Sequence, residues 1–75
     1  MKLSELKYFV EVAEQQSIRK AAENLYTSQP NLSRAIKSLE EKLGDSLFVR
    51  SNHGVTLTKT GQSVYYYAKS ILDQV

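Results

Sequence analysis

Apolar side chains recur at intervals of three and four residues through the first half of the chain, and this spacing predicts three helices. The first is expected over residues 3–15, with lysine and glutamate on the face opposite its apolar positions. Ser17 can cap a second helix that ends near Leu25. The third is expected over residues 29–43 and is followed by Gly44, a residue type that accepts the left-handed backbone found after many helices.

Small and large apolar residues have different expected uses in this predicted core. Ala21 and Ala22 leave room for the second and third helices to cross closely at a steep angle. On the third helix the same periodicity predicts four core positions, which are Leu32, Ile36, Leu39 and Leu43.

The second half of the chain begins with a different period. Two short β-rich runs, at residues 47–50 and 55–57, flank a turn that contains Gly54, and this arrangement predicts a β-hairpin. Thr58 can cap a last helix that runs to the end of the chain, although Gly61 is expected to weaken its first turn.

The predicted fold class is therefore mainly α. A helix, a tight turn and a second helix, followed by a hairpin, form the layout of a winged helix-turn-helix with a three-helix core and a two-stranded wing. We expect this domain over residues 1–58 and a linker or dimerisation helix over residues 59–75, truncated before a further domain that follows Val75.

Apolar residues on that last helix repeat as they do along the seam between two paired helices. The residues of this seam are Val64, Ala68, Ile71 and Val75. Because the earlier elements already close a three-helix core, we expect the seam to pack against the same helix of a second copy. Tyr65, Tyr66 and Tyr67 point in different directions on a helix, so packing is expected for them rather than stacking on nucleic-acid bases.

Polar side chains gather on the face of the third helix that lies opposite its core positions. At about 100° per residue, that face carries Pro30, Ser33, Arg34, Lys37 and Glu41. The single proline fits the first turn, where a backbone N–H has no acceptor within the helix. Such a face can meet DNA or a protein partner, and the layout alone leaves both open.

Composition narrows the function classes further. The net charge is only +2, but residues 17–60 hold seven Lys or Arg against four Asp or Glu. The chain has no cysteine, no apolar run long enough to cross a membrane and no signal peptide, so we expect a cytoplasmic protein with no membrane association. It also has no nucleophile paired with a base, no metal-ligand cluster and no phosphate-binding loop, so we expect neither an enzyme nor a cofactor.

The sequence resembles the DNA-binding domain of the LysR-type transcriptional regulators along nearly its whole length. The densest part of the likeness lies in residues 21–50, AAENLYTSQPNLSRAIKSLEEKLGDSLFVR. The likeness extends from Leu3-x-x-Leu6-x-x-Phe9 at the start of the chain to Leu57-Thr58 and Gly61 near its end. It implies a transcriptional regulator associated with the nucleoid.

This resemblance implies roles for individual residues on double-stranded DNA. The residues expected to read base edges are Gln29, Pro30, Ser33 and Arg34, and those expected at the DNA backbone are Thr27, Ser28, Lys37, Arg50 and His53. Arg34 can donate two hydrogen bonds to guanine. Instead of contacting DNA, Arg50 could form an ion pair with Asp45 or Glu41. His53 could instead be a solvated residue of the turn.

The resemblance also implies partners. A homodimer formed through the last helix would present the third helix of each copy to successive major grooves of a pseudo-palindromic operator. In family members a small-molecule effector acts on a C-terminal domain, and the full-length proteins are commonly tetramers. The competing interpretation is a winged-helix module for protein–protein interaction, which would need an apolar patch on the exposed face of the third helix. Whether Thr27 or Ser28 caps that helix stays open.

Overall fold

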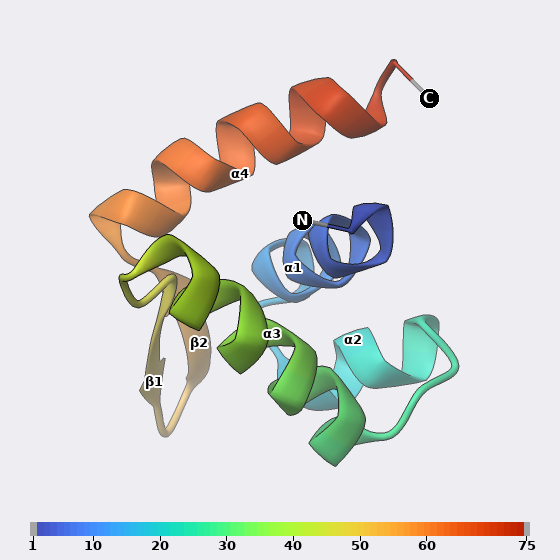
Figure 1. Ribbon diagram of the computed structural model, residues 1–75. Coiled ribbons are helices and arrows are strands. Elements are labelled where there is room, and N and C mark those ends of the chain that lie inside the picture. Colours follow the sequence, from blue (N-terminus) through green and yellow to red (C-terminus); the bar gives the residue numbers. More distant parts are fainter. Residues whose placement is uncertain (1, 75) are drawn as a thin grey trace.

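The computed structural model describes residues 2–74, which form four helices and one two-stranded antiparallel sheet (Figure 1). In chain order the elements are α1 (Leu3–Gln15), α2 (Ile18–Asn24), α3 (Gln29–Leu43), β1 (Phe48–Ser51), β2 (Gly54–Leu57) and α4 (Lys59–Leu72). The winged helix-turn-helix architecture predicted from the sequence is confirmed. None of the helices within residues 2–74 has the length and apolar character that crossing a membrane requires.

Hydroxyl side chains cap three of the helices. Ser17 accepts a hydrogen bond from the backbone N–H of Lys20 at the start of α2, and Thr58 accepts one from Gly61 at the start of α4. Ser28 caps α3 by accepting from the backbone N–H of Asn31 over 3.1 Å. Ser28, not Thr27, therefore supplies the cap that the sequence left undecided.

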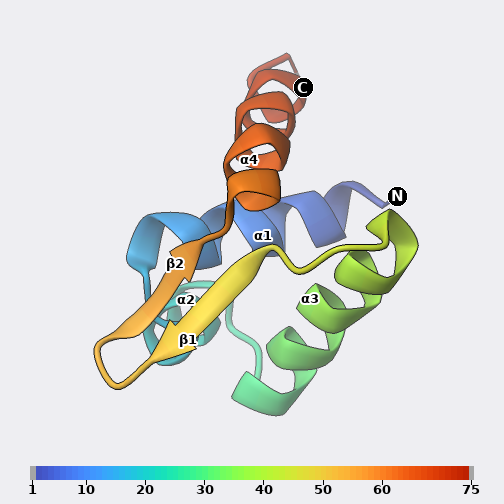
Figure 2. The same ribbon diagram turned by 90° about the vertical axis from the view of Figure 1, so that its left-hand side faces the viewer.

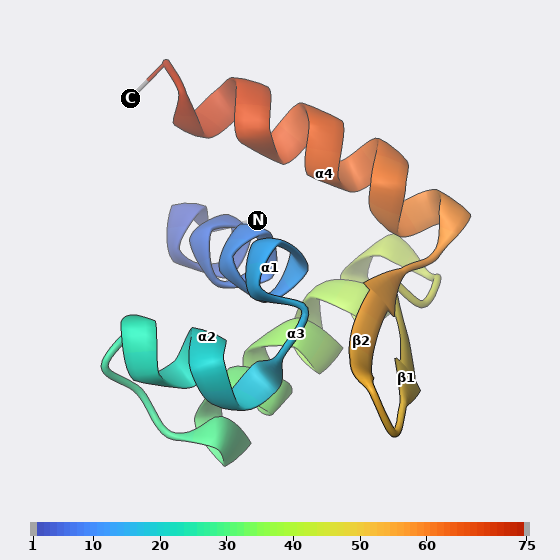
Figure 3. The same cartoon turned by 180° about the vertical axis from the view of Figure 1, so that it is seen from behind.

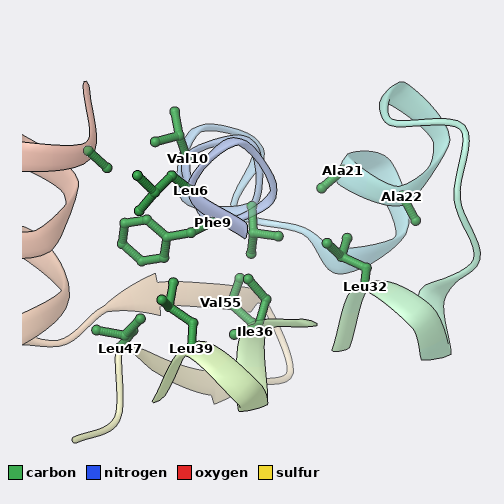
Figure 4. Packing of buried hydrophobic residues seen from close by; sticks show 12 residues of the cluster. Leu6, Phe9, Val10, Ala21, Ala22, Leu32, Ile36, Leu39, Leu47 and Val55 are labelled. Carbon is green, nitrogen blue, oxygen red and sulfur yellow. The ribbon is translucent and has the colours of Figure 1, made fainter. Parts of the chain in front are cut away.

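The core lies where α1, α3 and the start of the wing converge (Figure 4). Phe9 is fully buried there, with Leu39 of α3 and Leu47 of the α3–β1 connection around it. Ala21 and Ala22 of α2 are buried, as expected, and α2 packs against both α1 and α3.

The last predicted core position of α3 differs from the expectation. Leu43, in the final turn of α3, is 37% exposed and does not join the buried core. The same end of α3 is held to α1 by Lys42, whose Nζ lies 3.0 Å from Glu5 Oε1. The hydrogen bond from Lys42 keeps the pKa of Glu5 below its ordinary value.

The wing is a hairpin in which Phe48 pairs with Leu57 and Ser51 with Gly54 (Figure 2). Its position is fixed at the turn after α1, because Val55 donates its backbone N–H to the Gln16 carbonyl oxygen over 3.2 Å. Gly54 approaches that same carbonyl so closely that a Cβ would overlap it. The wing is therefore packed onto the helical core.

α4 crosses over α1 on the side of the molecule away from α2 (Figure 3). Ala68 is 1% exposed, and Val64, Tyr65 and Leu72 pack against the same core. The premise that the earlier elements already close the core is therefore wrong: α4 covers a face of α1 that would otherwise be open.

This packing corrects the expected dimer seam. Ala68 is buried by its own chain and is not available to a second copy, whereas Ile71 is 45% exposed. Val75 lies outside the described residues. α4 ends at Leu72 instead of continuing to the end of the chain.

The three consecutive tyrosines of α4 differ in their burial. Tyr65 packs on the core as expected, whereas Tyr66 and Tyr67 are exposed and their rings meet edge to face, with centroids 5.5 Å apart. Packing within the protomer is therefore confirmed for Tyr65 alone.

Candidate nucleic-acid interface

The start of α3 and the turn of the wing lie on one side of the molecule, opposite α4 (Figures 1 and 2). The residues expected at DNA from the sequence come from these two places. The structure therefore brings the residues before and within the first half of α3 to the same side as the wing residues 50–53.

The α2–α3 turn leaves the N-terminus of α3 open. Tyr26 adopts the left-handed conformation at φ 55° and its side chain is 96% exposed. This reversal of the backbone is followed by Thr27 and by the capping residue Ser28. The first turn of α3 contains no acidic side chain, so the positive end of the helix dipole is not neutralised locally.

The polar face of α3 has the exposure that binding requires. Gln29, Pro30, Arg34 and Lys37 are exposed, and Ser33 is half-buried beside them. Leu32, Ile36 and Leu39 hold the opposite face in the core (Figure 4). Because the buried face fixes the rotation of α3 about its axis, the polar face can point only outwards.

Arg34 is already hydrogen-bonded on this surface. Its Nη2 donates to Asn31 Oδ1 over 3.1 Å, and the Asn31 side-chain amide donates to Thr27 Oγ1 over 2.9 Å. Asn31 was not among the residues expected at DNA. The available signal was spacing, because Asn31 precedes Arg34 by three residues, an interval at which side chains meet on a helix.

Lys37 and Arg50 keep their charge available. Within residues 2–74 neither makes an ion pair. The alternative pairing of Arg50 with Asp45 is absent there, because the Asp45 carboxylate instead accepts from Thr60 Oγ1 and from the Ser46 backbone N–H.

Arg50 is exposed on β1, opposite Val55 of β2. His53 is exposed in the turn of the wing, where its backbone N–H donates to Ser51 Oγ over 3.2 Å. The imidazole is thus presented outward from a turn whose backbone is held by a neighbouring hydroxyl. The exposed Arg50 and His53 of the wing therefore accompany the polar face of α3.

A family model described as "Bacterial regulatory helix-turn-helix protein, lysR family" matches residues 3–62. The chain is 47% identical over 75 residues to the HTH-type transcriptional regulator BenM of Acinetobacter baylyi. It is 45% identical over 74 residues to the Hca operon transcriptional activator HcaR of Escherichia coli. These matches cover 100% and 99% of the chain but only 25% of each relative, so the chain spans about a quarter of their length.

Solved structures of DNA-binding domains have nearly the same fold as this chain. The BenM_DBD/catB site 1 DNA complex superposes with a TM-score of 0.95 at 46% identity, covering 99% of this chain and 83% of that one. The CbnR_DBD–DNA complex superposes with a TM-score of 0.94 at 39% identity, covering 99% and 85%. The chain belongs to the LysR family of bacterial helix-turn-helix regulatory proteins.

Proposed function

We propose that this chain is the DNA-binding domain of a LysR-type transcriptional regulator and that it binds double-stranded DNA sequence-specifically, with α3 in the major groove. The observation that carries the proposal is the exposed polar face of α3, which is held outward by the buried Leu32, Ile36 and Leu39. The start of this helix lies on the same side of the molecule as the turn of the wing (Figure 1). The likeness to the BenM and CbnR domains in complex with DNA supports it.

In this function the first half of α3 reads base edges. Gln29, Pro30, Ser33 and Arg34 lie in its first two turns, where recognition helices meet bases. Arg34 suits guanine, because its planar group can donate to O6 and N7 together.

Backbone contacts come from the residues around that reading face. The hydroxyls of Thr27 and Ser28 stand beside the open N-terminus of α3, and Lys37, Arg50 and His53 offer exposed cationic or hydrogen-bonding groups to phosphates. Phosphate contacts of this kind fix the register of the protein on DNA without selecting sequence.

The protein acts as a homodimer in this proposal, with α4 paired to α4 of a second copy. Ala68 is used inside the protomer, so the paired face is the adjacent one, formed by Val64, Tyr67 and Ile71 at intervals of three and four. Twofold pairing suits a pseudo-palindromic operator whose half-sites fall in successive major grooves.

For the whole regulator we infer domains beyond residues 1–58 and the linker helix at 59–75. The chain spans about a quarter of BenM and HcaR, so most of a full-length relative has no counterpart here. We infer that a small-molecule effector binds in such a C-terminal domain, that full-length copies assemble as dimers or tetramers, and that the protein works on the bacterial chromosome in the cytoplasm. It acts by binding, without catalysis.

The competing function, a module for protein–protein interaction, fits the surface less well. An apolar docking face would need large hydrophobic side chains exposed along α3. Within the described residues, Leu43 in the last turn is the one such side chain on α3 that is exposed, and the first half carries Gln29, Arg34 and Lys37 instead.

The test measures affinity for two DNA duplexes, one selected by the protein from a randomised pool and one of random sequence, each at two salt concentrations. Arg34→Ala is expected to weaken binding to the selected duplex about 5- to 150-fold and to affect the random duplex much less. Lys37→Ala is expected to weaken both and to lower the slope of log affinity against log salt by about 1.

Lys7→Ala is the matched control for the lost charge, since Lys7 is an exposed lysine on α1. We expect it to change neither affinity substantially. Failure of the protein to enrich any sequence, or equal losses on both duplexes for Arg34→Ala, would contradict the proposed reading function.

A further inference from the structure

Asn31 connects two groups that the proposed function places against DNA. Its side-chain Nδ2 donates to Thr27 Oγ1 over 2.9 Å, and its Oδ1 accepts from Arg34 Nη2 over 3.1 Å. Its backbone N–H is used separately, in the cap with Ser28. Both ends of the Asn31 side chain therefore have a defined partner, although the residue is exposed.

The two partners fix which way the amide faces. A side-chain amide has donor hydrogens on nitrogen and an acceptor oxygen, and a guanidinium can only donate. Rotating the Asn31 amide by half a turn would set its NH₂ group against the guanidinium of Arg34, donor against donor. The oxygen must therefore face Arg34 while the nitrogen faces Thr27.

This orientation has a consequence for Arg34. An exposed arginine samples many rotamers, and ordering it on binding costs conformational entropy. The hydrogen bond to Asn31 restricts the Arg34 guanidinium before DNA arrives and uses one of its five N–H groups. Four N–H groups remain for a base edge.

It has a second consequence for Thr27. The Thr27 hydroxyl oxygen accepts from Asn31, so its own hydrogen is left to donate. A phosphate oxygen is an acceptor for that hydrogen. Hydrogen bonds can then link a phosphate through Thr27, Asn31 and Arg34 to a base. Those from Arg34 through Asn31 and Thr27 to the phosphate all run in one direction, the arrangement in which neighbouring hydrogen bonds strengthen one another.

We propose that Asn31 is a specificity-determining positioning residue, which orients Arg34 for base reading and couples it to the backbone contact of Thr27. This inference rests on the proposed DNA-binding function. It assigns a role to position 31, which the family motif does not specify. Asn31 acts through its neighbours and does not itself need to touch a base.

The experiment uses Asn31→Ala in the 75-residue chain. The substitution keeps the backbone N–H that donates to Ser28, so the cap of α3 is retained and helix content by circular dichroism should match the wild type. Affinity is measured for the selected duplex, for duplexes that change each of its base pairs in turn, and for a random duplex.

Asn31→Ala is expected to reduce discrimination about three- to tenfold, the effect of losing one exposed hydrogen bond of ordinary strength. The loss should fall at the same base pairs at which Arg34→Ala loses discrimination, and affinity for the random duplex should change by less than about twofold. In an Arg34→Ala background, adding Asn31→Ala should reduce discrimination no further, because there is no guanidinium left to orient.

Two further variants separate positioning from general effects. Asn24→Ala makes the same chemical change at the end of α2, where the amide donates to Glu11, and should leave discrimination intact. Asn31→Asp keeps an acceptor for Arg34 but removes the donor to Thr27 and adds a negative charge. It should keep the Arg34-dependent base preference while binding all DNA more weakly.

Wild-type discrimination in Asn31→Ala, or losses that add fully in the double variant, would overturn the role of Asn31 and leave the proposed function standing. Loss of the base preference in Asn31→Asp would likewise overturn it, because the acceptor for Arg34 is still present. A wild-type protein that prefers no duplex would instead overturn the proposed function, and this inference with it.

Discussion

The α-carbon of Gly61, in the first turn of α4, faces the backbone carbonyl of Leu47. A Cβ built on Gly61 would overlap that oxygen and would lie 3.0 Å from Leu57 Cδ2. The carbonyl cannot easily withdraw, because it accepts the backbone N–H of Thr58 over 3.0 Å, and Thr58 in turn caps α4. Glycine is required here by the close approach of two backbone segments.

Two opposing effects meet in Gly61→Ala. Alanine favours an α-helix by about 1 kcal/mol over glycine, but forcing a methyl group against a fixed carbonyl typically costs about 1–3 kcal/mol or more. Because the obstructing atom belongs to the backbone, we expect the overlap to dominate and the free energy of unfolding to fall. Urea denaturation followed by circular dichroism measures the change.

Gln62→Ala is the control for Gly61→Ala, since Gln62 is the next residue of α4 and is exposed. It should change the free energy of unfolding by no more than about 0.5 kcal/mol. A Gly61→Ala variant as stable as the wild type, or more stable, would show that Leu47 moves aside without cost.

At the scale of elements, Glu14 joins α1 to α4. Its Oε2 accepts from Tyr65 Oη over 2.9 Å and lies 3.4 Å from Lys69 Nζ. The hydrogen bond to Glu14 raises the pKa of Tyr65 above its usual value, and the negative charge of Glu14 raises the pKa of Lys69. Both side chains therefore hold their protons more tightly in the folded state than in the unfolded one.

The pH dependence of this contact follows from those directions. A group whose pKa is raised on folding contributes stability in full below its unfolded pKa, about 10 for tyrosine, and loses the contribution as pH rises through the folded value. Tyr65→Phe should therefore lower the free energy of unfolding at pH 7 by about 0.5–1.5 kcal/mol, the value of one hydrogen bond. The difference from wild type should shrink as pH rises above 10.

Chemical denaturation across this pH range tests the contact between α1 and α4. Tyr66→Phe is the matched control, because the Tyr66 hydroxyl makes no hydrogen bond within the described part of the chain. Equal stability of Tyr65→Phe and wild type at pH 7, or a difference that persists unchanged at high pH, would contradict the role of the hydroxyl.

At the scale of the whole molecule, α4 lies opposite the side that carries the start of α3 and the turn of the wing (Figure 1). Pairing through α4 would therefore leave uncovered the side of each copy that we propose faces DNA. On the face proposed for pairing, Tyr67 and Ile71 are exposed and Val64 is half-buried.

Ile71→Glu should abolish the proposed dimer, because it places a charge within the paired apolar face. Ile71 is 45% exposed in the protomer, so the fold itself should tolerate the change. Sedimentation velocity over a range of protein concentrations is expected to show a dimer for the wild type and a monomer for the variant.

Gln62→Glu is the control for added charge, since Gln62 is exposed on a different side of α4 from Ile71. It should sediment like the wild type. A dimer that persists in Ile71→Glu would show that the copies pair through another surface.

The sequence by itself determined the elements of this fold, because helix and hairpin formation depend on neighbours a few residues apart. Periodicity located the helices, and Ser17 and Thr58 cap them as expected. The polar face of α3 was also predictable, since leucine and isoleucine at intervals of three and four leave the remaining positions facing outwards.

Only the tertiary structure decided how these elements meet, because contacts between distant segments depend on the relative positions of elements that no local spacing records. In the tertiary structure Ala68 is buried within its own chain and Leu43 is partly exposed. The Asp45 carboxylate accepts a hydrogen bond from Thr60 instead of pairing with Arg50. The tertiary structure also explains the glycine at position 61, which helix propensity disfavours. Gly61 closely approaches the carbonyl of Leu47, fourteen positions earlier in the chain.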